Sequence, residues 1–185
     1  MIVSGTIPTD NFDRTVVSRS SDEGLSMVNP NYTSKEWKWR NNCQRCVPAY
    51  EMRRRGYDVT AKPNPANNLA EDVPAAHFEL AWEEKNIKWC MRDDGLHQIK
   101  EYMQNWGDGA RAEVFVCFDD GEQGTRGHVF FAEQIEGKTY FYDPQNFKAD
   151  ASEYFKIAKK GKTKILRIDN NVPSDYILEC CENRR

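Results

Sequence analysis

The chain lacks the features that mark membrane, secreted and low-complexity proteins. It contains no apolar run of the length that a membrane span needs, and its mean hydropathy of −0.82 is polar. Its first residues lack a basic stretch followed by an apolar one, so we predict no signal peptide. Eleven Gly and eight Pro in 185 residues exclude collagen-like and low-complexity classes. Aromatic residues make up 12%, which is too many for a disordered chain. We expect one globular domain with no membrane contact.

The chain also lacks a large excess of positive or negative charge. The chain has 26 basic and 29 acidic residues, and this balance argues against general nucleic-acid binding. Residues 35–62 are the exception, with eight basic and three acidic residues. The sequence Arg53-Arg54-Arg55 lies in this segment. It is typical of a solvated helix face, and the alternative is that it meets an acidic partner.

Cysteines are too few for a disulfide scaffold at this size. Without a secretory signal we expect the six of them to be mostly free thiols. Cys43 and Cys46 have the CxxC spacing of half a zinc site, with Cys180 and Cys181 as the possible other half. Adjacent cysteines make poor paired ligands and a second CxxC is missing, so we predict no metal and no cofactor. A thioredoxin-like site is disfavoured because no buried strand precedes Cys43.

The order of the expected elements is helices first and an antiparallel sheet afterwards, which is typical of an α+β fold. Residues 1–34 are rich in Ser, Thr, Asp and Asn, and we expect a loosely ordered leader there. The catalytic domain would span 35–170, and 171–185 would be a C-terminal tail. We expect helices at 46–56, 75–89 and 96–106, and strands at 57–63, 112–118, 128–135, 138–143 and 163–169.

A thiol at the start of the first helix is the first candidate for chemistry. The positive end of the helix dipole and the unpaired backbone amides there stabilise a thiolate, which is the nucleophilic form. Pro48 prefers the first helical turn, and this places the helix start near Cys46. A start at Cys43 would put Pro48 inside the helix, where it should cause a kink.

His128 is the best of the three histidines for a general base, because it begins a strand directly after Gly127. If Glu136-Gly137 is a two-residue turn, His128 and Asp143 lie on one face of the hairpin and diagonal to each other. A three-residue turn would break this parity. The sequence therefore indicates a Cys-His-Asp triad, in which the histidine moves the proton and the aspartate orients the imidazole. The alternative is a core hairpin with a satisfied histidine.

Three motifs in this order resemble the papain-fold toxin family of glutamine deamidases, found in bacterial polymorphic toxins and phage head proteins. They are Asn42-Cys43-Gln44-Arg45-Cys46-Val47 running into 49–59, then Gly127-His128-Val129-Phe130, then Asp143-Pro144-Gln145. The resemblance implies a papain-like fold, with a nucleophile helix packed on an antiparallel sheet. It also implies a secreted or injected toxin that deamidates a glutamine of a protein in the target-cell cytoplasm, and that pairs with an immunity protein.

The family motif favours Cys43 as nucleophile, with His128 and Asp143, while the position of Pro48 favours Cys46. An oxyanion hole would combine the backbone amide of the nucleophile with a side-chain amide. Asn42 and Gln44 are the candidates for that amide, although either could instead cap the helix. Gln145 would orient the triad or close a turn. We expect Arg45, Trp39 and Arg53 to contact the substrate or a partner.

Other functions remain open at this stage. A papain-like peptidase or a transglutaminase would pass through the same thioester as a deamidase. A non-catalytic module could instead use the basic helix to bind a partner. A nuclease is disfavoured, because the charge balance is acidic and no carboxylate–Lys cluster is present.

Overall fold

The computed structural model describes residues 7–15, 21–65, 75–119 and 125–184. At its centre is a five-stranded sheet in the order β2-β6-β3-β4-β5, in which every neighbouring pair is antiparallel. A second, two-stranded sheet pairs β1 with β7. The strands are β1 (Val59–Ala61), β2 (Lys88–Cys90), β3 (Arg111–Asp119), β4 (Thr125–Ile135), β5 (Lys138–Tyr142), β6 (Thr163–Arg167) and β7 (Cys181–Asn183).

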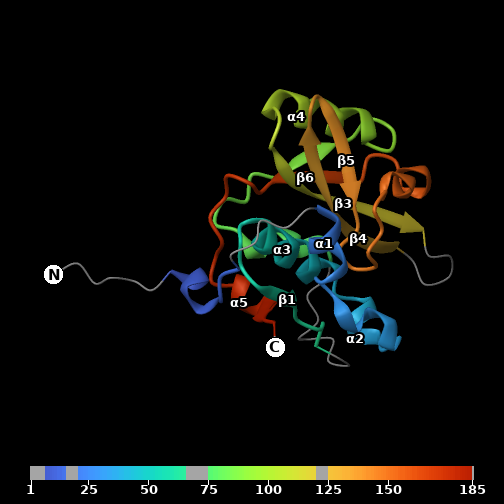
Figure 1. Cartoon of the computed structure of the whole chain (residues 1–185). Coiled ribbons are helices and arrows are strands. Elements are labelled where there is room, and N and C mark those ends of the chain that lie inside the picture. The colour runs from blue at the N-terminus through green and yellow to red at the C-terminus, as the bar shows by residue number, and fades with distance from the viewer. Residues whose placement is uncertain (1–6, 16–20, 66–74, 120–124, 185) are drawn as a thin grey trace.

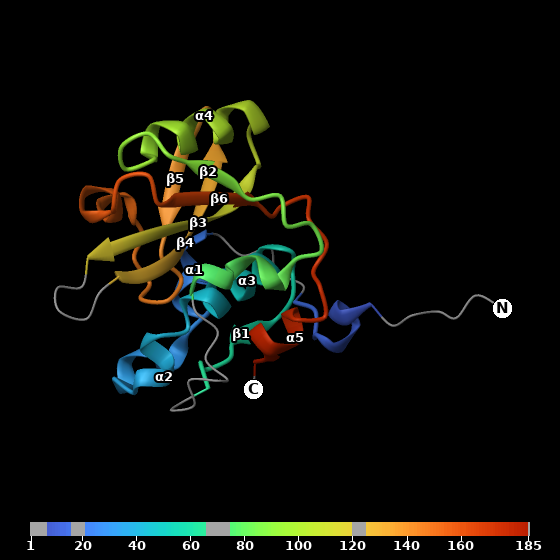
Figure 2. The ribbon, with the colours of Figure 1, turned by 180° about the vertical axis from the view of Figure 1, so that it is seen from behind.

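Helices cover both faces of the large sheet, so the predicted α+β class is confirmed (Figures 1 and 2). Helix α3 packs on one face and α4 on the other, each over its own apolar cluster. No helix among the described residues is long and apolar enough to cross a membrane. The α-helices are α1 (Ser21–Ser26), α2 (Trp37–Arg40), α3 (Cys43–Arg54), α4 (Leu96–Trp106) and α5 (Ile177–Cys180). The 3-10 helices are Pro8–Asn11, Pro30–Ser34, Ala75–Ala81 and Ser152–Ile157.

Helix α3 begins earlier than the position of Pro48 indicated. It runs unbroken from Cys43 to Arg54 with Pro48 inside it. Tertiary packing overrides the local preference of the proline, since nearly every residue of this helix is buried. The predicted end is confirmed, because Gly56 has φ +95° and the amides of Gly56 and Tyr57 donate back to Arg53 and Met52.

The basic run on α3 is not a solvated face. Arg53 is buried and donates to the backbone oxygen of Val59 at 2.7 Å. Arg54 forms two hydrogen bonds of 2.6 Å with Glu133 on β4. Arg55 pairs with Glu51, which is fully buried and also takes two bonds from Arg111 on β3. These side chains attach the helix to the sheet, and they are not available to an acidic partner.

The helix predicted for 75–89 is wrong. A 3-10 helix spans Ala75–Ala81, with a non-helical backbone at His77. Phe78 and Trp82 are buried as expected, but Trp89 is half exposed and belongs to edge strand β2. The three aromatic residues therefore do not share the single face that a continuous helix would give them.

The hairpin prediction is confirmed. Glu136 and Gly137 form a two-residue turn with positive φ at both positions, and Ile135 pairs with Lys138. The ladder ends at Phe131 and Tyr142, one residue before Asp143. Asp143 then forms an isolated bridge with Lys148, so the chain turns away from β4 there.

The prediction of a loosely ordered leader is wrong for the described part of 1–34. Leu25 and Val28 are buried in the same cluster as α3, and Asn29 is fully buried. The Ser- and Asn-rich composition suggested loose order, but a few well-spaced apolar residues are enough to anchor the segment. The tail of 171–185 also belongs to the fold, because β7 pairs with β1 through Ala61 and Cys181.

Candidate active site

A groove of about 380 Å³ opens where α3 and β4 begin. Cys43 and Gln44 line it from the helix, and Gly127 and His128 line it from the strand. The sheet and the helix therefore present their candidate catalytic residues to the same space. The other described residues of the wall are Tyr32, Trp37, Arg40, Asn41, Asn64, Ala75, Phe118, Arg126, Gln145, Asn146 and Tyr154.

Cys43 is the first residue of α3 and lies at the positive end of its dipole. The amides of Arg45 and Cys46 donate the first hydrogen bonds of the helix, both to the carbonyl oxygen of Asn42. The amide of Cys43 comes before these two and takes no part in the hydrogen bonds of the helix. The sulfur of Cys43 lies 3.7 Å from Oε1 of Gln44, and Cys43 and His128 line the same groove. Cys43 is therefore the thiol of α3 that an incoming substrate in the groove can reach.

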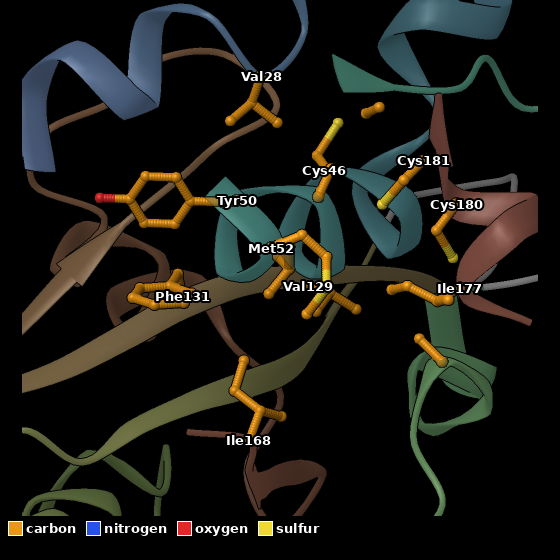
Figure 3. Packing of buried hydrophobic residues seen from close by; sticks show 14 of the residues in the cluster. Val28, Cys46, Tyr50, Met52, Val129, Phe131, Ile168, Ile177, Cys180 and Cys181 are labelled. Carbon is orange, nitrogen blue, oxygen red and sulfur yellow. The ribbon is translucent and has the colours of Figure 1, made fainter. Parts of the chain in front are cut away.

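Cys46 faces away from the groove into the core. It is fully buried among apolar side chains, with Cys180 and Cys181 close by (Figure 3). Burial raises the pKa of the Cys46 thiol well above its usual value, and the neighbouring thiols raise it further. Burial likewise raises the pKa of Cys181. These thiols are protonated and have no access to the groove, so the structure favours Cys43 over Cys46 as the reactive residue.

His128 and Asp143 are in direct contact. Nε2 of His128 lies 2.8 Å from Oδ2 of Asp143, whose side chain is fully buried. Burial acts to lower the pKa of His128, but the charge of Asp143 and the hydrogen bonds to Asp143 and Cys43 outweigh it and raise the pKa to about 10. Burial acts to raise the pKa of Asp143, and the charge of His128 together with its hydrogen bonds lowers it overall. The pair is therefore an imidazolium and a carboxylate at neutral pH.

Tyr154 is a site residue that the sequence did not reveal. Its hydroxyl donates to Oδ2 of Asp143 at 2.5 Å, and its ring packs edge-on against His128 with centroids 5.0 Å apart. Burial and the negative charge of Asp143 raise the pKa of this phenol, so it remains a donor. Tyr154 lies in the 3-10 helix Ser152–Ile157, for which the sequence carried no signal.

Asn42 does not point its side chain into the groove as an oxyanion donor. Its Nδ2 donates to the backbone oxygen of Lys62 at 3.1 Å and to Oδ1 of Asn29 at 3.2 Å. Its Oδ1 accepts from Gln145 Nε2 at 3.4 Å. Asn42 is thus engaged in a buried network, whereas Gln44 is one of the residues that line the groove.

Gln145 contacts both Asp143 and Asn42, the residue directly before Cys43. Its backbone amide donates to Oδ1 of Asp143 at 2.9 Å, and its side chain reaches Asn42. Asp143 therefore receives hydrogen bonds from His128, Tyr154 and the Gln145 amide. This arrangement fixes the carboxylate and, through it, the imidazole ring.

The residues predicted to contact a substrate or partner lie elsewhere. Arg45 and Arg53 are 4% and 1% exposed, and Trp39 is 9% exposed. Arg45 donates to the backbone oxygen of Glu179, which belongs to α5. A charged side chain on a nearly all-buried helix must find a partner inside the protein, which sequence spacing alone does not reveal.

The exposed side chains of the groove are those of Trp37, Arg40 and Arg126. Arg40 lies over the ring of Tyr32 at 5.0 Å, and Arg126 donates to Oδ1 of Asn41 at 3.3 Å. Within the described parts of the chain, no group of His, Cys, Asp and Glu side chains has the arrangement of a metal site. The groove thus combines one thiol, one imidazolium and two guanidinium groups.

We predict that replacing Asp143 by Asn lowers the pKa of His128 well below its value of about 10. The charge of Asp143 is the largest influence that raises this pKa, so in the variant burial would be opposed only by Cys43. NMR titration of the His128 ring checks this, with the exposed Asp175→Asn as the matched control. Wild-type protein should keep the ring protonated beyond pH 8, and a wild-type midpoint near 6.5 would contradict the ion pair.

Comparison with known proteins agrees with this geometry. The family model described as papain fold toxin 1, glutamine deamidase, matches residues 41–147. This range contains Cys43, His128 and Asp143, and it covers more than half of the chain. No curated protein and no solved structure matches the chain. The chain therefore belongs to the papain fold toxin 1 family of glutamine deamidases and has the papain-like fold of that family.

Proposed function

We propose that this domain deamidates a glutamine side chain of a target protein through Cys43, His128 and Asp143. The observation that carries the proposal is the position of Cys43 and His128 on the wall of one groove, with the His128 ring 2.8 Å from the Asp143 carboxylate. The family supports the deamidase reaction and the role as a toxin.

In the first step the Cys43 thiolate attacks the carboxamide carbon of the glutamine. A carbon–sulfur bond forms, and the carbonyl electron pair moves onto oxygen. His128, held as imidazolium by Asp143, gives its proton to the amide nitrogen. The carbon–nitrogen bond then breaks, ammonia leaves, and a thioester joins the former glutamine to Cys43.

In the second step water attacks the thioester carbon while neutral His128 takes a proton from it. The carbon–sulfur bond breaks, the product is a glutamate side chain, and the thiolate–imidazolium pair is restored. Asp143 and Tyr154 keep their contacts throughout. Their part is to hold the ring so that Nδ1, the nitrogen not bonded to Asp143, faces the sulfur.

The oxyanion of each tetrahedral intermediate would lie near the N-terminus of α3. The backbone amide of Cys43 precedes the helical ladder and is one donor. Gln44 is the side-chain donor that we propose, because it lines the groove next to the sulfur. Asn42 is no longer a candidate for that role, since its amide is engaged with Lys62 and Asn29.

The same thioester would serve a peptidase or a transglutaminase, and only the fate of the acyl group separates them. The family favours deamidation. The partner-binding alternative has lost its main support, since Arg53, Arg54 and Arg55 are engaged within the fold. As a toxin, the domain would be delivered within a larger protein and act in the target-cell cytoplasm. An immunity protein would then be expected to cover the groove.

We predict that Cys43→Ala lowers the rate of ammonia release from a blocked glutamine peptide at least about a thousandfold, because the nucleophile is lost. Cys46→Ala should stay within about tenfold of wild type, because this residue contacts no reacting atom and only leaves a small core cavity. Ammonia release and melting temperature are measured for both variants. Equal losses in two folded variants, or full activity of Cys43→Ala, would contradict the assignment.

The groove also suggests which glutamines are accepted. Two arginines, Arg40 and Arg126, lie on its walls, and none of the described lining residues is acidic. Neither guanidinium is paired with a carboxylate of the described chain. Opposite charge would therefore favour a target segment with acidic residues beside the glutamine.

We predict that the double variant Arg40→Gln/Arg126→Gln raises KM about tenfold for a glutamine peptide flanked by glutamates. A peptide with neutral flanks should show little change, because it gains nothing from the two charges. Lys160→Gln, an exposed change outside the groove, is the matched control. An equal rise in KM for both peptides would show that the arginines do not select charge.

A further inference from the structure

We propose that Asn29 is a positioning residue that sets the distance and orientation between Cys43 and His128. This inference rests on the proposed function, and it adds a residue outside the range of the family match. Asn29 is fully buried and makes hydrogen bonds to three separate parts of the chain. It touches no groove residue that would react, so its effect would pass through the residues that it holds.

The orientation of the Asn29 amide follows from its partners. Its Nδ2 lies 2.9 Å from the backbone oxygen of Trp39 and 3.0 Å from that of Gln145. A carbonyl oxygen can only accept, so the atom between these two oxygens must be the nitrogen. Nδ2 also lies 3.2 Å from Oδ1 of Asn42, while Oδ1 of Asn29 accepts from Asn42 at 3.2 Å. Because an amide nitrogen has only two N–H groups, the contact with Asn42 Oδ1 shares one of them, and the donation from Asn42 to Asn29 Oδ1 completes the link between the two asparagines.

The first partner, Asn42, is the residue directly before the nucleophile. It is the N-cap of α3, yet it makes no side-chain capping bond. Its amide is used instead for Asn29, Lys62 and Gln145. A favourable N-cap bond is forgone for this network, which fixes the backbone from which Cys43 projects.

The second partner, Gln145, belongs to the segment that carries Asp143. Its carbonyl accepts from Asn29, and its own amide donates to Asp143 Oδ1 at 2.9 Å. Asp143 in turn holds His128 at 2.8 Å. Asn29 therefore joins the helix that bears the thiol to the loop that sets the imidazole, two segments that are far apart in the sequence.

The segment that carries Asn29 is itself fixed to the core. Val28 is fully buried, and its carbonyl accepts from the amide of Ala61 at 2.8 Å. Leu25 is buried in the same cluster, and a Cβ added at Gly24 would lie 3.3 Å from the ring of Tyr50 on α3. Because the segment is anchored to α3 and β1, it can act as a rigid support for the amide.

Loss of the Asn29 amide would leave buried carbonyl groups of Trp39 and Gln145 without this donor. The protein would become less stable, but a positioning role predicts more than that. Cys43 and the Asp143 segment would shift relative to each other, and the thiolate would lose the imidazolium that stabilises it. A residue that only supports the core would not produce this second effect.

The test compares Asn29→Ala and Asn29→Ser with Val28→Ala, a core truncation at the adjacent, equally buried position. Each folded variant is labelled with iodoacetamide across a pH series, and the rate at Cys43 is followed by mass spectrometry. Melting temperature is measured in parallel. Asn29→Ser keeps a hydroxyl donor, so it provides a second variant where the alanine change prevents folding.

We expect Asn29→Ala to slow labelling of Cys43 at mildly acidic pH about tenfold and to shift the pH profile upward, with Asn29→Ser in between. Val28→Ala should lower the melting temperature while leaving the profile unchanged. Profiles that are the same for the Asn29 variants and Val28→Ala would overturn the positioning role. Slow labelling of Cys43 in the wild type would instead contradict the proposed function, so the two failures are distinguishable.

Discussion

The ion pairs between α3 and the sheet decide where the N-terminus of that helix lies. Glu51 is fully buried and forms salt bridges with Arg55 and Arg111. Arg54 forms a bidentate salt bridge with Glu133. A buried charge is costly without its partner, so few other placements of the helix are compatible with these pairs. The edge-on contact of Tyr50 with Phe131, at 4.6 Å between centroids, fills the space between them. With α3 fixed in this way, Cys43 lies at the same groove as His128, which is near the start of β4.

Much of the fold could be predicted from local patterns. The apolar spacing of 96–106 gave the bounds of α4, and Glu136-Gly137 gave the register of the hairpin. Both signals are short-range, since they depend on periodicity and turn chemistry alone. The start of α3 was harder, because Pro48 favoured a later start and only tertiary packing overrides that preference. The helix expected at 75–89 failed for a similar reason, since pairing of β2 with β6 is a long-range contact.

The residues of the candidate site also differ in whether local sequence patterns or long-range contacts determine their place. His128 and Asp143 could be brought together from the hairpin register alone. Cys43 was favoured only by the resemblance of its motif to the family, because the position of Pro48 indicated a helix start near Cys46. Tyr154 and Asn29 could not be predicted, because their roles depend on contacts with Asp143 and Asn42 that no spacing encodes. Arg45 and Arg53 were expected to contact a substrate or partner, but α3 is buried on nearly all sides and both side chains lie inside the fold. The segment before residue 35, expected to be loose, supplies a buried amide to the site.

The central claim is that Cys43 becomes acylated by a glutamine side chain. The most direct test is intact mass spectrometry of a reaction with a blocked glutamine peptide, quenched in acid before turnover is complete. The account predicts an adduct on Cys43 with the mass of the peptide less ammonia, followed by a product in which glutamine has become glutamate. Cleavage of the peptide backbone, or formation of the glutamate product without any adduct on Cys43, would contradict it.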